Sequence, residues 1–448
     1  MLFSSISFLY YFLPCVLIIY GIVPGKYKNG ALLLVSLVFY AWGEPKYVFL
    51  MIALILWSYF AGILIQRYGK TRKGKAVLWC ALTVSIGALC FFKFSDTAWP
   101  IGISFYTFQL TSYLVDVYRG TAEVQNNLIN LGAYVTMFPQ LIAGPIVRYK
   151  DIEKQLRERT HGFDIILEGV QRFLTGLGKK ILISNALGEL CEIFKASDEK
   201  SVLFFWVYAI SYTLQIYFDF SGYSDMAIGL GKIFGFHFPE NFNYPYVSKS
   251  ITEFWRRWHI SLGTWFRDYV YIPMGGNRVS KPRWYFNIFV VWLLTGLWHG
   301  AAPNFVFWGL LFAVLLVIEK QWFLRKLEKM RILNHVYVML VVIVSFVIFN
   351  ASGLGEAFSY LAGMFGMGGV PFVSAEGIYY LKSYGVLLLL AMIGATPLVK
   401  KVTVSLASGK TGKKLFPWIR PVFLLTLLAV CTAYLIDSSF NPFLYFRF

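Results

Sequence analysis

Charged residues are scarce in this sequence: aspartate, glutamate, lysine and arginine make up 14% of its 448 positions. Soluble domains carry about 25% of these residues. Hydrophobic residues account for 58% of the chain, and its mean hydropathy is +0.60. This composition excludes an ordinary soluble globular protein.

Cysteine is scarce as well, and its five residues are scattered singly along the chain. They form no Cys-x-x-Cys pair and no cluster with histidine, so the sequence supports neither a disulfide framework nor a zinc site. We expect buried, unreactive thiols. The five positions are Cys15, Cys80, Cys90, Cys191 and Cys431.

The motifs of several enzyme classes are missing. No Walker A loop, G-x-S-x-G elbow, H-E-x-x-H helix or G-x-G-x-x-G turn occurs where its structural context would support it. This argues against P-loop nucleotide hydrolysis, a soluble serine hydrolase, zinc-dependent proteolysis and dinucleotide binding. We therefore expect neither a metal nor a tightly bound cofactor.

Long apolar runs are abundant. A helix of about 20 apolar residues crosses a bilayer, and the runs predict ten to twelve spans in an all-α polytopic membrane protein. No basic residue precedes Lys26, so the first run is expected to be a membrane helix rather than a cleaved signal. The runs lie at 7–24, 30–43, 46–66, 76–92, 99–117, 127–146, 165–186, 201–220, 284–299, 303–324, 333–350, 383–399 and 418–437.

The net charge of +18 is unevenly distributed. Lysine and arginine concentrate in the short segments 67–75, 320–331 and 400–420, whereas 332–381 has neither. Basic loops stay in the cytoplasm, which predicts a membrane protein with 351–380 and both termini outside. We expect lipid as its surroundings and no nucleic-acid partner.

His299 lies in an apolar stretch between Trp292 and Asn304. If a helix starts near Arg283, sixteen residues place His299 roughly 24 Å along it. A titratable group at such depth predicts a functional site. The alternative is a core histidine bonded to a neighbouring helix. We expect Thr295–Gly296 and the segment from Gly300 to Pro303 to interrupt the helix and line a cavity.

His259 lies in a second tryptophan-rich segment, within 236–283, where charges and aromatic residues interleave as in helices at a membrane interface. Arg256, Arg257 and Arg267 flank it and could hold phosphate groups or an acidic carrier. Alone, His259 is more typical of an ordinary interfacial histidine. A continuous helix would place these residues on one apolar face: Trp255, Trp258, His259, Leu262, Trp265 and Phe266.

Two further groups are polar. The segment 215–225 carries two carboxylates and several hydroxyls between apolar runs, which must face water or pair with arginines. A structural network is favoured over an acid/base pair there. The glycines of 272–278 suit either a phosphate cradle or a simple turn. The polar residues of 215–225 are Gln215, Tyr217, Asp219, Ser221, Tyr223, Ser224 and Asp225.

We expect a single transmembrane domain with N-terminal helices at 1–145, a core with interfacial helices at 146–325 and C-terminal helices at 326–448. No internal repeat is evident, which weakens a transporter interpretation. The largest outside loop, 351–380, is too small to fold alone. Chemistry on an external polymer would therefore need a partner protein.

Together, several motifs resemble the membrane-bound O-acyltransferase (MBOAT) family. They are FWRRWHISL at 254–262, WFRDY at 265–269, YIPMGGNR at 271–278 and LWHG at 297–300. FPQLIAGPIVRY at 138–149 and YFDFSGYSD at 217–225 are similar to its bacterial branch, which includes the membrane subunit of alginate O-acetylation and its peptidoglycan and cellulose counterparts.

The resemblance implies about eleven membrane helices, with re-entrant and interfacial ones, around a central tunnel. His299 would be the catalytic base and His259 the second polar residue of the site, a position where the family has Asn or His. Donor-binding or tunnel-lining roles are expected for Trp255, Arg256, Arg257, Trp258, Arg267, Asp268, Trp298, Asn304, Tyr217, Asp219 and Ser221.

The donor implied is acetyl-CoA or another cytoplasmic acyl thioester, used as a substrate, and the acceptor is an extracytoplasmic polysaccharide. A serine-dependent partner of the SGNH type would complete the transfer, docking near Gly353–Phe372 or Asn441–Phe448. Three alternatives remain: D-alanyl transfer from a carrier protein, transport of a polysaccharide or lipid-linked sugar, and a noncatalytic scaffold that would leave His299 dispensable.

Overall fold

The computed structural model describes residues 2–437 except 96, 98, 143 and 328. All regular structure in this part of the chain is helical, which confirms the all-α prediction. Seven of its helices are long and apolar enough to cross a membrane, and the apolar helix Phe8–Ile22 is shorter. The seven are Tyr47–Tyr68, Arg72–Phe94, Val202–Ile233, Pro303–Leu327, Leu333–Asn350, Ala375–Gly394 and Lys410–Asp437.

The chain forms two compact units. The first comprises residues 1–173, 223–240 and 264–269, and the second comprises 174–222, 241–263 and the chain from Val270 onwards. The helices α9 (Phe163–Gly178), α11 (Val202–Ile233) and α13 (Ile260–Phe266) contribute residues to both. The single domain with three sections stays a prediction.

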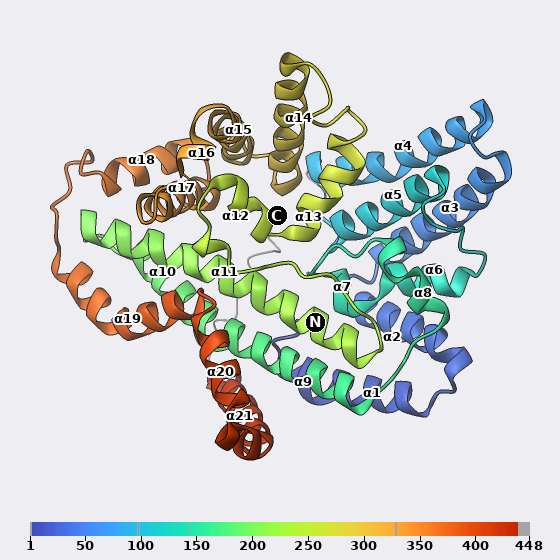
Figure 1. Ribbon diagram of the computed structural model, residues 1–448, viewed down its shortest axis with the longest axis horizontal. Helices are drawn as coiled ribbons and strands as arrows, with labels where there is room; N and C mark the ends of the chain where they lie inside the picture. The colour runs from blue at the N-terminus through green and yellow to red at the C-terminus, as the bar shows by residue number, and fades with distance from the viewer. Residues whose placement is uncertain (1, 96, 98, 143, 328, 438–448) are drawn as a thin grey trace. The chain divides into compact units, whose positions relative to one another are not determined.

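In the first unit, α3 packs against α4 and α5, and α2 packs against α6 (Figure 1). Helix α8 (Tyr149–Arg157) buries Tyr149, Ile152 and Leu156 and carries its charges on the other side. Its further elements are the π-helix Phe8–Phe12, α1 (Leu13–Ile22), the 3-10 helix Gly25–Tyr27, α2 (Lys28–Gly43), α3 (Tyr47–Tyr68), α4 (Arg72–Phe94), α5 (Ile103–Arg119), α6 (Leu128–Thr136), α7 (Phe138–Leu141) and α8 (Tyr149–Arg157).

The second unit holds both candidate histidines. Its elements are the π-helix Lys179–Asn185, α10 (Ala186–Ala196), the 3-10 helix Pro245–Val247, α12 (Ile251–Arg257), the end of the π-helix Arg267–Tyr271, α14 (Lys281–His299), α15 (Pro303–Ile318), the π-helix Glu319–Phe323, α16 (Leu324–Leu327), α17 (Leu333–Asn350), α18 (Leu354–Met364), α19 (Ala375–Gly394), α20 (Leu398–Ser408) and α21 (Lys410–Asp437), besides parts of α9, α11 and α13.

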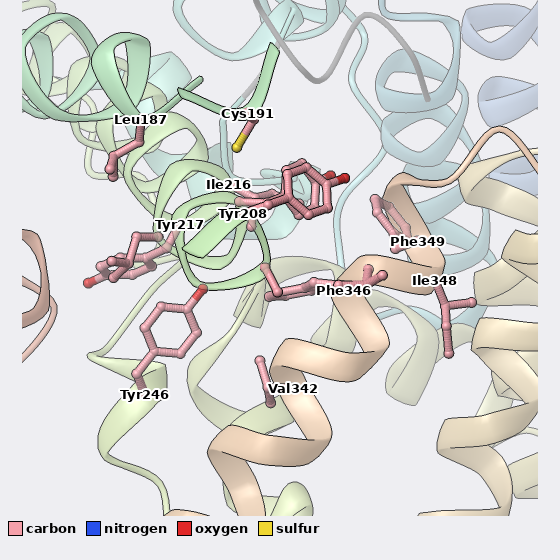
Figure 2. Close-up of a cluster of buried hydrophobic side chains, with 14 of the residues drawn as sticks. Leu187, Cys191, Tyr208, Ile216, Tyr217, Tyr246, Val342, Phe346, Ile348 and Phe349 are labelled. Carbon is pink, nitrogen blue, oxygen red and sulfur yellow. The ribbon is translucent and has the colours of Figure 1, made fainter. Parts of the chain in front are cut away.

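Aromatic side chains fill the core of this second unit. Figure 2 shows Phe346 and Phe349 of α17 in one buried cluster with Tyr208 and Tyr217 of α11. The hydroxyl of Tyr246 donates a hydrogen bond to a backbone carbonyl of α11. Close packing of this kind holds the helices that carry the site at fixed positions.

Helix α11 is longer than the apolar run 201–220 predicted. It continues for 32 residues to Ile233, through the polar segment that was expected to lie between runs. The helix can continue because salt bridges satisfy its carboxylates: Lys180 pairs with Asp219, and Arg172 pairs with Asp225. Pairing lowers the cost of placing charge away from water.

The prediction that Thr295 and Gly296 interrupt helix α14 is wrong, since α14 runs unbroken from Lys281 to His299. A Cβ added at Gly296 would lie 2.5 Å from the carbonyl oxygen of Phe305, and one at Gly309 would meet the carbonyl of Trp292. The two glycines therefore let α14 and α15 approach closely, as small residues do between membrane helices.

Replacing Gly296 by alanine should push α14 and α15 apart and destabilise the protein by about 1–3 kcal/mol, as overpacking does. Thermal unfolding in detergent measures the effect. Gly385→Ala is the matched control, because Gly385 lies within α19 and a Cβ there meets nothing within 4 Å. Equal midpoints for the two variants would contradict this account of the α14–α15 contact.

One further expectation is wrong in part. Cys191 and Cys431 are buried, while Cys15, Cys80 and Cys90 are exposed; an apolar run does not say which face of its helix is covered by protein. The loop 351–380, which is predicted to face outside, contains helix α18. The predicted docking segment Asn441–Phe448 lies outside the described residues.

The segment 272–278 is a turn. The backbone N–H groups of both glycines are already used: Gly275 donates to the Ile272 carbonyl and Gly276 to the Tyr271 carbonyl. Both glycines have positive φ, 100° and 56°, which glycine adopts without steric penalty. Of the two predicted alternatives, this geometry favours the simple turn over the phosphate cradle.

Candidate active site

His299 is the last residue of α14 and is 8% exposed. Its imidazole is surrounded by aromatic rings, with centroids at 4.8 Å for Trp298, 5.0 Å for Phe349 and 5.3 Å for Trp308. The latter two rings meet it edge to face. Such an environment excludes water and strengthens electrostatic interactions at the ring.

The helix ends at His299 for a reason visible in the sequence. Gly300 is extended, and α15 begins at Pro303, as predicted for the segment after the histidine. Proline suits the first turn of a helix and disfavours helix before it. The α14–α15 connection thus presents His299 at a helix end instead of within a continuous helix.

Asn304 fixes the start of α15. Its side-chain amide nitrogen lies within hydrogen-bond distance of three carbonyls at the end of α17, with 2.9 Å to that of Ala351. The last carbonyls of a helix lack partners within the helix, so Asn304 joins α15 to the C-terminus of α17. This contact is structural, whereas the sequence predicted a donor-binding or tunnel-lining residue.

His259 lies at a break between two short helices, so the predicted continuous apolar face is wrong. Helix α12 ends at Arg257, Trp258 is extended, and His259 has a φ of 44° before α13 starts at Ile260. Left-handed φ is uncommon outside glycine, although His and Asn are enriched there. The break turns the His259 ring away from the helical register.

The segment before α12 stabilises this break, and sequence reasoning missed it. The Ile260 N–H donates to the Asn241 carbonyl, and the Asn243 N–H donates to the Arg257 carbonyl. Asn241 Oδ1 lies 3.1 Å from His259 Nδ1 and 2.8 Å from Ser261 Oγ. The available signal was a pair of asparagines, Asn241 and Asn243, on either side of Phe242.

Trp298 brings the two histidines into one site. Its ring centroid is 4.8 Å from that of His299 and 6.0 Å from that of His259. Phe220 of α11 meets His259 edge to face at 4.7 Å. His259 is 3% exposed, and burial lowers its pKa to about 3, so this imidazole is neutral at physiological pH.

Trp255 of α12 and Trp258, which follows this helix, share the neighbour Phe254 but otherwise contact different aromatic residues. Trp255 contacts Trp292, Trp308 and Phe312, and Trp308 in turn contacts His299. The other neighbours of Trp258 are Tyr217, Phe242, Tyr246 and Phe346. The predicted residues Tyr217 and Trp258 are therefore part of the aromatic packing.

The two arginines of α12, Arg256 and Arg257, differ in their exposure and in their partners. Arg257 pairs with Glu253 at 2.8 Å and donates to the Asn243 carbonyl at 3.0 Å, so it braces the fold. The pKa of Glu253 is lowered overall: burial raises it, but hydrogen bonds from the Lys249 backbone and from Arg257 outweigh burial. Arg256 is exposed and is the arginine of this pair available to a ligand.

Glu319 is a second residue that sequence reasoning missed. Its buried carboxylate accepts hydrogen bonds from the N–H groups of Ile251 and Thr252, at 2.7 and 2.9 Å. These are first-turn groups of α12, which lack partners within the helix and favour negative charge. The signal was a carboxylate at the end of an apolar run. Glu319 anchors the helix that precedes His259.

Asp219 pairs with a lysine, not with an arginine as expected. Its carboxylate lies 2.6 Å from Nζ of Lys180, and both side chains are almost fully buried. Ser221, one turn away from Tyr217, is buried, and its hydroxyl makes no hydrogen bond within the part of the chain described. Asp219 thus forms a structural ion pair with Lys180 rather than a pair of carboxylates.

Arg267 and Asp268 belong to the first unit, where they form a network of their own. Asp268 lies 2.6 Å from Arg148 and 2.7 Å from Arg267. Burial raises the pKa of Asp268, but the hydrogen bond and charge of Arg267, together with Arg148, lower it overall. The structure thus gives these two predicted residues partners other than the histidines.

The residues around the two histidines suit proton transfer. Among the described residues, no three of His, Cys, Asp and Glu gather as metal ligands. Two buried imidazoles beside one indole provide basic nitrogens in surroundings of low polarity. A neutral imidazole is an effective general base for a hydroxyl group.

Comparison with known proteins identifies the family of this chain. Residues 121–363 match the model of the membrane-bound O-acyltransferase family. A Pseudomonas putida protein named "Probable alginate O-acetylase AlgI" is 38% identical over the full length of both chains. A Helicobacter pylori peptidoglycan O-acetyltransferase is 30% identical over all of this chain and 98% of its own.

A Bacillus subtilis teichoic acid D-alanyltransferase is 33% identical, over 48% of this chain and 58% of its own. The family match and the full-length relatives agree with the motifs around both histidines and with the polytopic helical fold. The chain belongs to the membrane-bound O-acyltransferase family and is a multi-pass membrane acyltransferase.

Proposed function

We propose that the protein transfers an acetyl group from a cytoplasmic thioester, acetyl-CoA, toward the hydroxyl groups of an extracytoplasmic polysaccharide. One observation carries this proposal: His299 and His259 both lie buried against Trp298. Neighbouring imidazoles at the end of an apolar helix suit removal of a hydroxyl proton.

His299 is the proposed base. As it takes the proton of the acceptor hydroxyl, the oxygen attacks the thioester carbonyl and a C–O bond forms. The C–S bond then breaks, and the departing thiolate receives the proton from the imidazolium. The thiol and the acetyl ester are the products, and no further reactant is required. The aromatic rings around His299 keep water from competing for the acyl group.

Acetyl is favoured over D-alanyl as the acyl group. The relatives that cover the whole chain are named for O-acetylation, whereas the D-alanyltransferase matches only about half of it. Alginate and peptidoglycan, which these names contain, are the acceptor classes to test first. A D-alanyl group on a carrier protein is the second candidate donor.

A partner protein is part of the proposal. The segment 351–380, proposed to face outside, holds the short helix α18, the start of α19 and exposed side chains such as Phe365 and Phe372. A long polysaccharide needs a larger surface to be oriented, so an SGNH-type acetyltransferase would receive the acyl group and place it on the polymer. This role requires a plasma-membrane location with 351–380 facing outward.

Donor binding should depend on Arg256 more than on Arg257. Arg256→Glu is expected to raise the KM for acetyl-CoA about tenfold, because an exposed cation that meets phosphate contributes about 1.5 kcal/mol. Initial rates at varied acetyl-CoA measure it. Arg257→Glu removes the salt bridge to Glu253 and the hydrogen bond to the Asn243 carbonyl. It should instead lower the midpoint of thermal unfolding. An unchanged KM in Arg256→Glu would leave Arg256 without a role in donor binding.

Reconstitution tests the function as a whole. The purified protein is placed in vesicles with radiolabelled acetyl-CoA on one side and polysaccharide on the other, with and without the extracytoplasmic partner. We expect label on the polymer only when both proteins are present. Efficient labelling without a partner would show direct transfer, and no turnover of acetyl-CoA under any condition would refute the acetyl donor.

A further inference from the structure

The hydrogen bonds of Asn241 indicate which tautomer the His259 ring adopts. Asn241 is 1% exposed, and its Oδ1 lies within hydrogen-bond distance of three groups. These are the backbone N–H of Ser261 at 3.3 Å, the hydroxyl of Ser261 at 2.8 Å and Nδ1 of His259 at 3.1 Å. The three meet on one oxygen.

The backbone N–H of Ser261 sets the direction of the other bonds. A backbone N–H only donates, so the amide atom facing it must be the oxygen of Asn241, not the nitrogen. That same oxygen faces Nδ1 of His259, and an amide oxygen only accepts. His259 must therefore carry a proton on Nδ1, and its neutral ring then has a lone pair on Nε2.

We propose that Asn241 is a positioning residue that holds His259 as the Nδ1–H tautomer, so that Nε2 is the ring nitrogen that accepts a hydrogen bond. This inference rests on the proposed acyl transfer and assigns His259 a share in it. The group that Nε2 receives is an O–H or N–H, such as the acceptor hydroxyl. Nε2 cannot donate to the oxyanion that forms at the thioester carbonyl.

The neutral state of His259 fits this role, since the low pKa that burial gives it keeps Nε2 unprotonated. The ionisable groups on neighbouring elements are held by partners or belong to the site itself. They are His299 on α14, Asp219 on α11 paired with Lys180, Arg257 paired with Glu253 on α12, and Glu240, which precedes Asn241 and pairs with Arg172.

Asn241→Asp separates this role from a structural one. The carboxylate has the same shape and still accepts from Ser261, so the fold should persist. A negative charge beside Nδ1 raises the pKa of His259, by about 1–3 units for a close opposite charge. The lone pair on Nε2 of His259 is lost as the pH falls through this raised pKa. The pH at which the nitrogen-15 signals of His259 change should therefore move up by about one unit or more.

Ser261→Ala is the matched control. It removes the hydroxyl that shares Oδ1 of Asn241 but leaves the backbone N–H and the His259 contact in place. We expect its kcat within about twofold of wild type and an unshifted titration of His259. If His259 titrates at its wild-type pH in the folded Asn241→Asp variant, the positioning role is overturned.

Nitrogen-15 NMR of histidine-labelled protein in vesicles tests the tautomer without reference to activity. The chain has five histidines, and the His259 signals are those lost in His259→Gln. We expect a protonated Nδ1 and an unprotonated Nε2 at neutral pH. A protonated Nε2 would overturn the inference. If the wild type transferred no acyl group but showed the expected tautomer, the proposed function would fail and the assignment of the tautomer would stand.

Discussion

His299→Ala should abolish acetyl transfer, with a loss of about 10²–10⁴-fold, as typically follows removal of a general base. The ring has no substitute of equal basicity among its neighbours Trp298, Trp308 and Phe349, which are aromatic. Turnover of labelled acetyl-CoA in vesicles measures the loss. His299→Gln, which retains more of the side-chain volume, should be equally inactive and exclude a packing effect.

His237→Ala is the control for this experiment. His237 is exposed, and the hydrogen bond recorded there is made by its backbone N–H, to Gln155. Its replacement should leave transfer unchanged. The scaffold and transport alternatives predict the opposite pattern for His299, since neither requires a base. Transfer by His299→Ala near the wild-type rate would rule out the proposed chemistry.

Separating Lys180 from Asp219 should produce the largest loss of stability. Each side chain is almost fully buried, and their charged atoms lie 2.6 Å apart. Removing one partner leaves an uncompensated buried charge, which costs about 3–5 kcal/mol. We expect Lys180→Met and Asp219→Asn each to lower the midpoint of thermal unfolding in detergent sharply.

The double variant, Lys180→Met with Asp219→Asn, should recover much of this loss because neither charge remains. A coupling of more than about 1 kcal/mol between the two changes is expected for residues in contact. Additive losses would mean that the salt bridge contributes nothing specific. Transfer by the folded double variant at a rate close to wild type would assign Asp219 to the fold and exclude an acid/base role.

Many of the helix boundaries could be predicted from nearby residues in the sequence. The end of α14 at His299 and the start of α15 at Pro303 follow from glycine and proline in the sequence. The role of Gly296 was mistaken because the same residue either breaks a helix or permits a close helix contact. The facing carbonyl of Phe305, which decides between them, is visible only in three dimensions.

The surroundings of His259 could not be predicted from the neighbouring sequence, because residues from distant segments determine them. Trp255, Trp258 and His259 have helical spacing, but the hydrogen bonds that end the helix come from Asn241 and Asn243 in a separate segment. Glu319, which anchors α12, lies 68 residues from Ile251. Such long-range partners override a periodic pattern, and the tautomer of His259 depends on one of them.

The left-handed backbone conformation at His259 limits which residue types can occupy this position. A φ of 44° is strained for β-branched and bulky side chains, whereas asparagine and histidine are several-fold enriched in this region. The resemblance to the family implied that this position holds either Asn or His. The two share little acid–base chemistry, but both tolerate this backbone and both offer a hydrogen-bond acceptor on a short planar side chain. The backbone conformation between α12 and α13 thus restricts the residue types that position 259 can hold, independently of their catalytic chemistry.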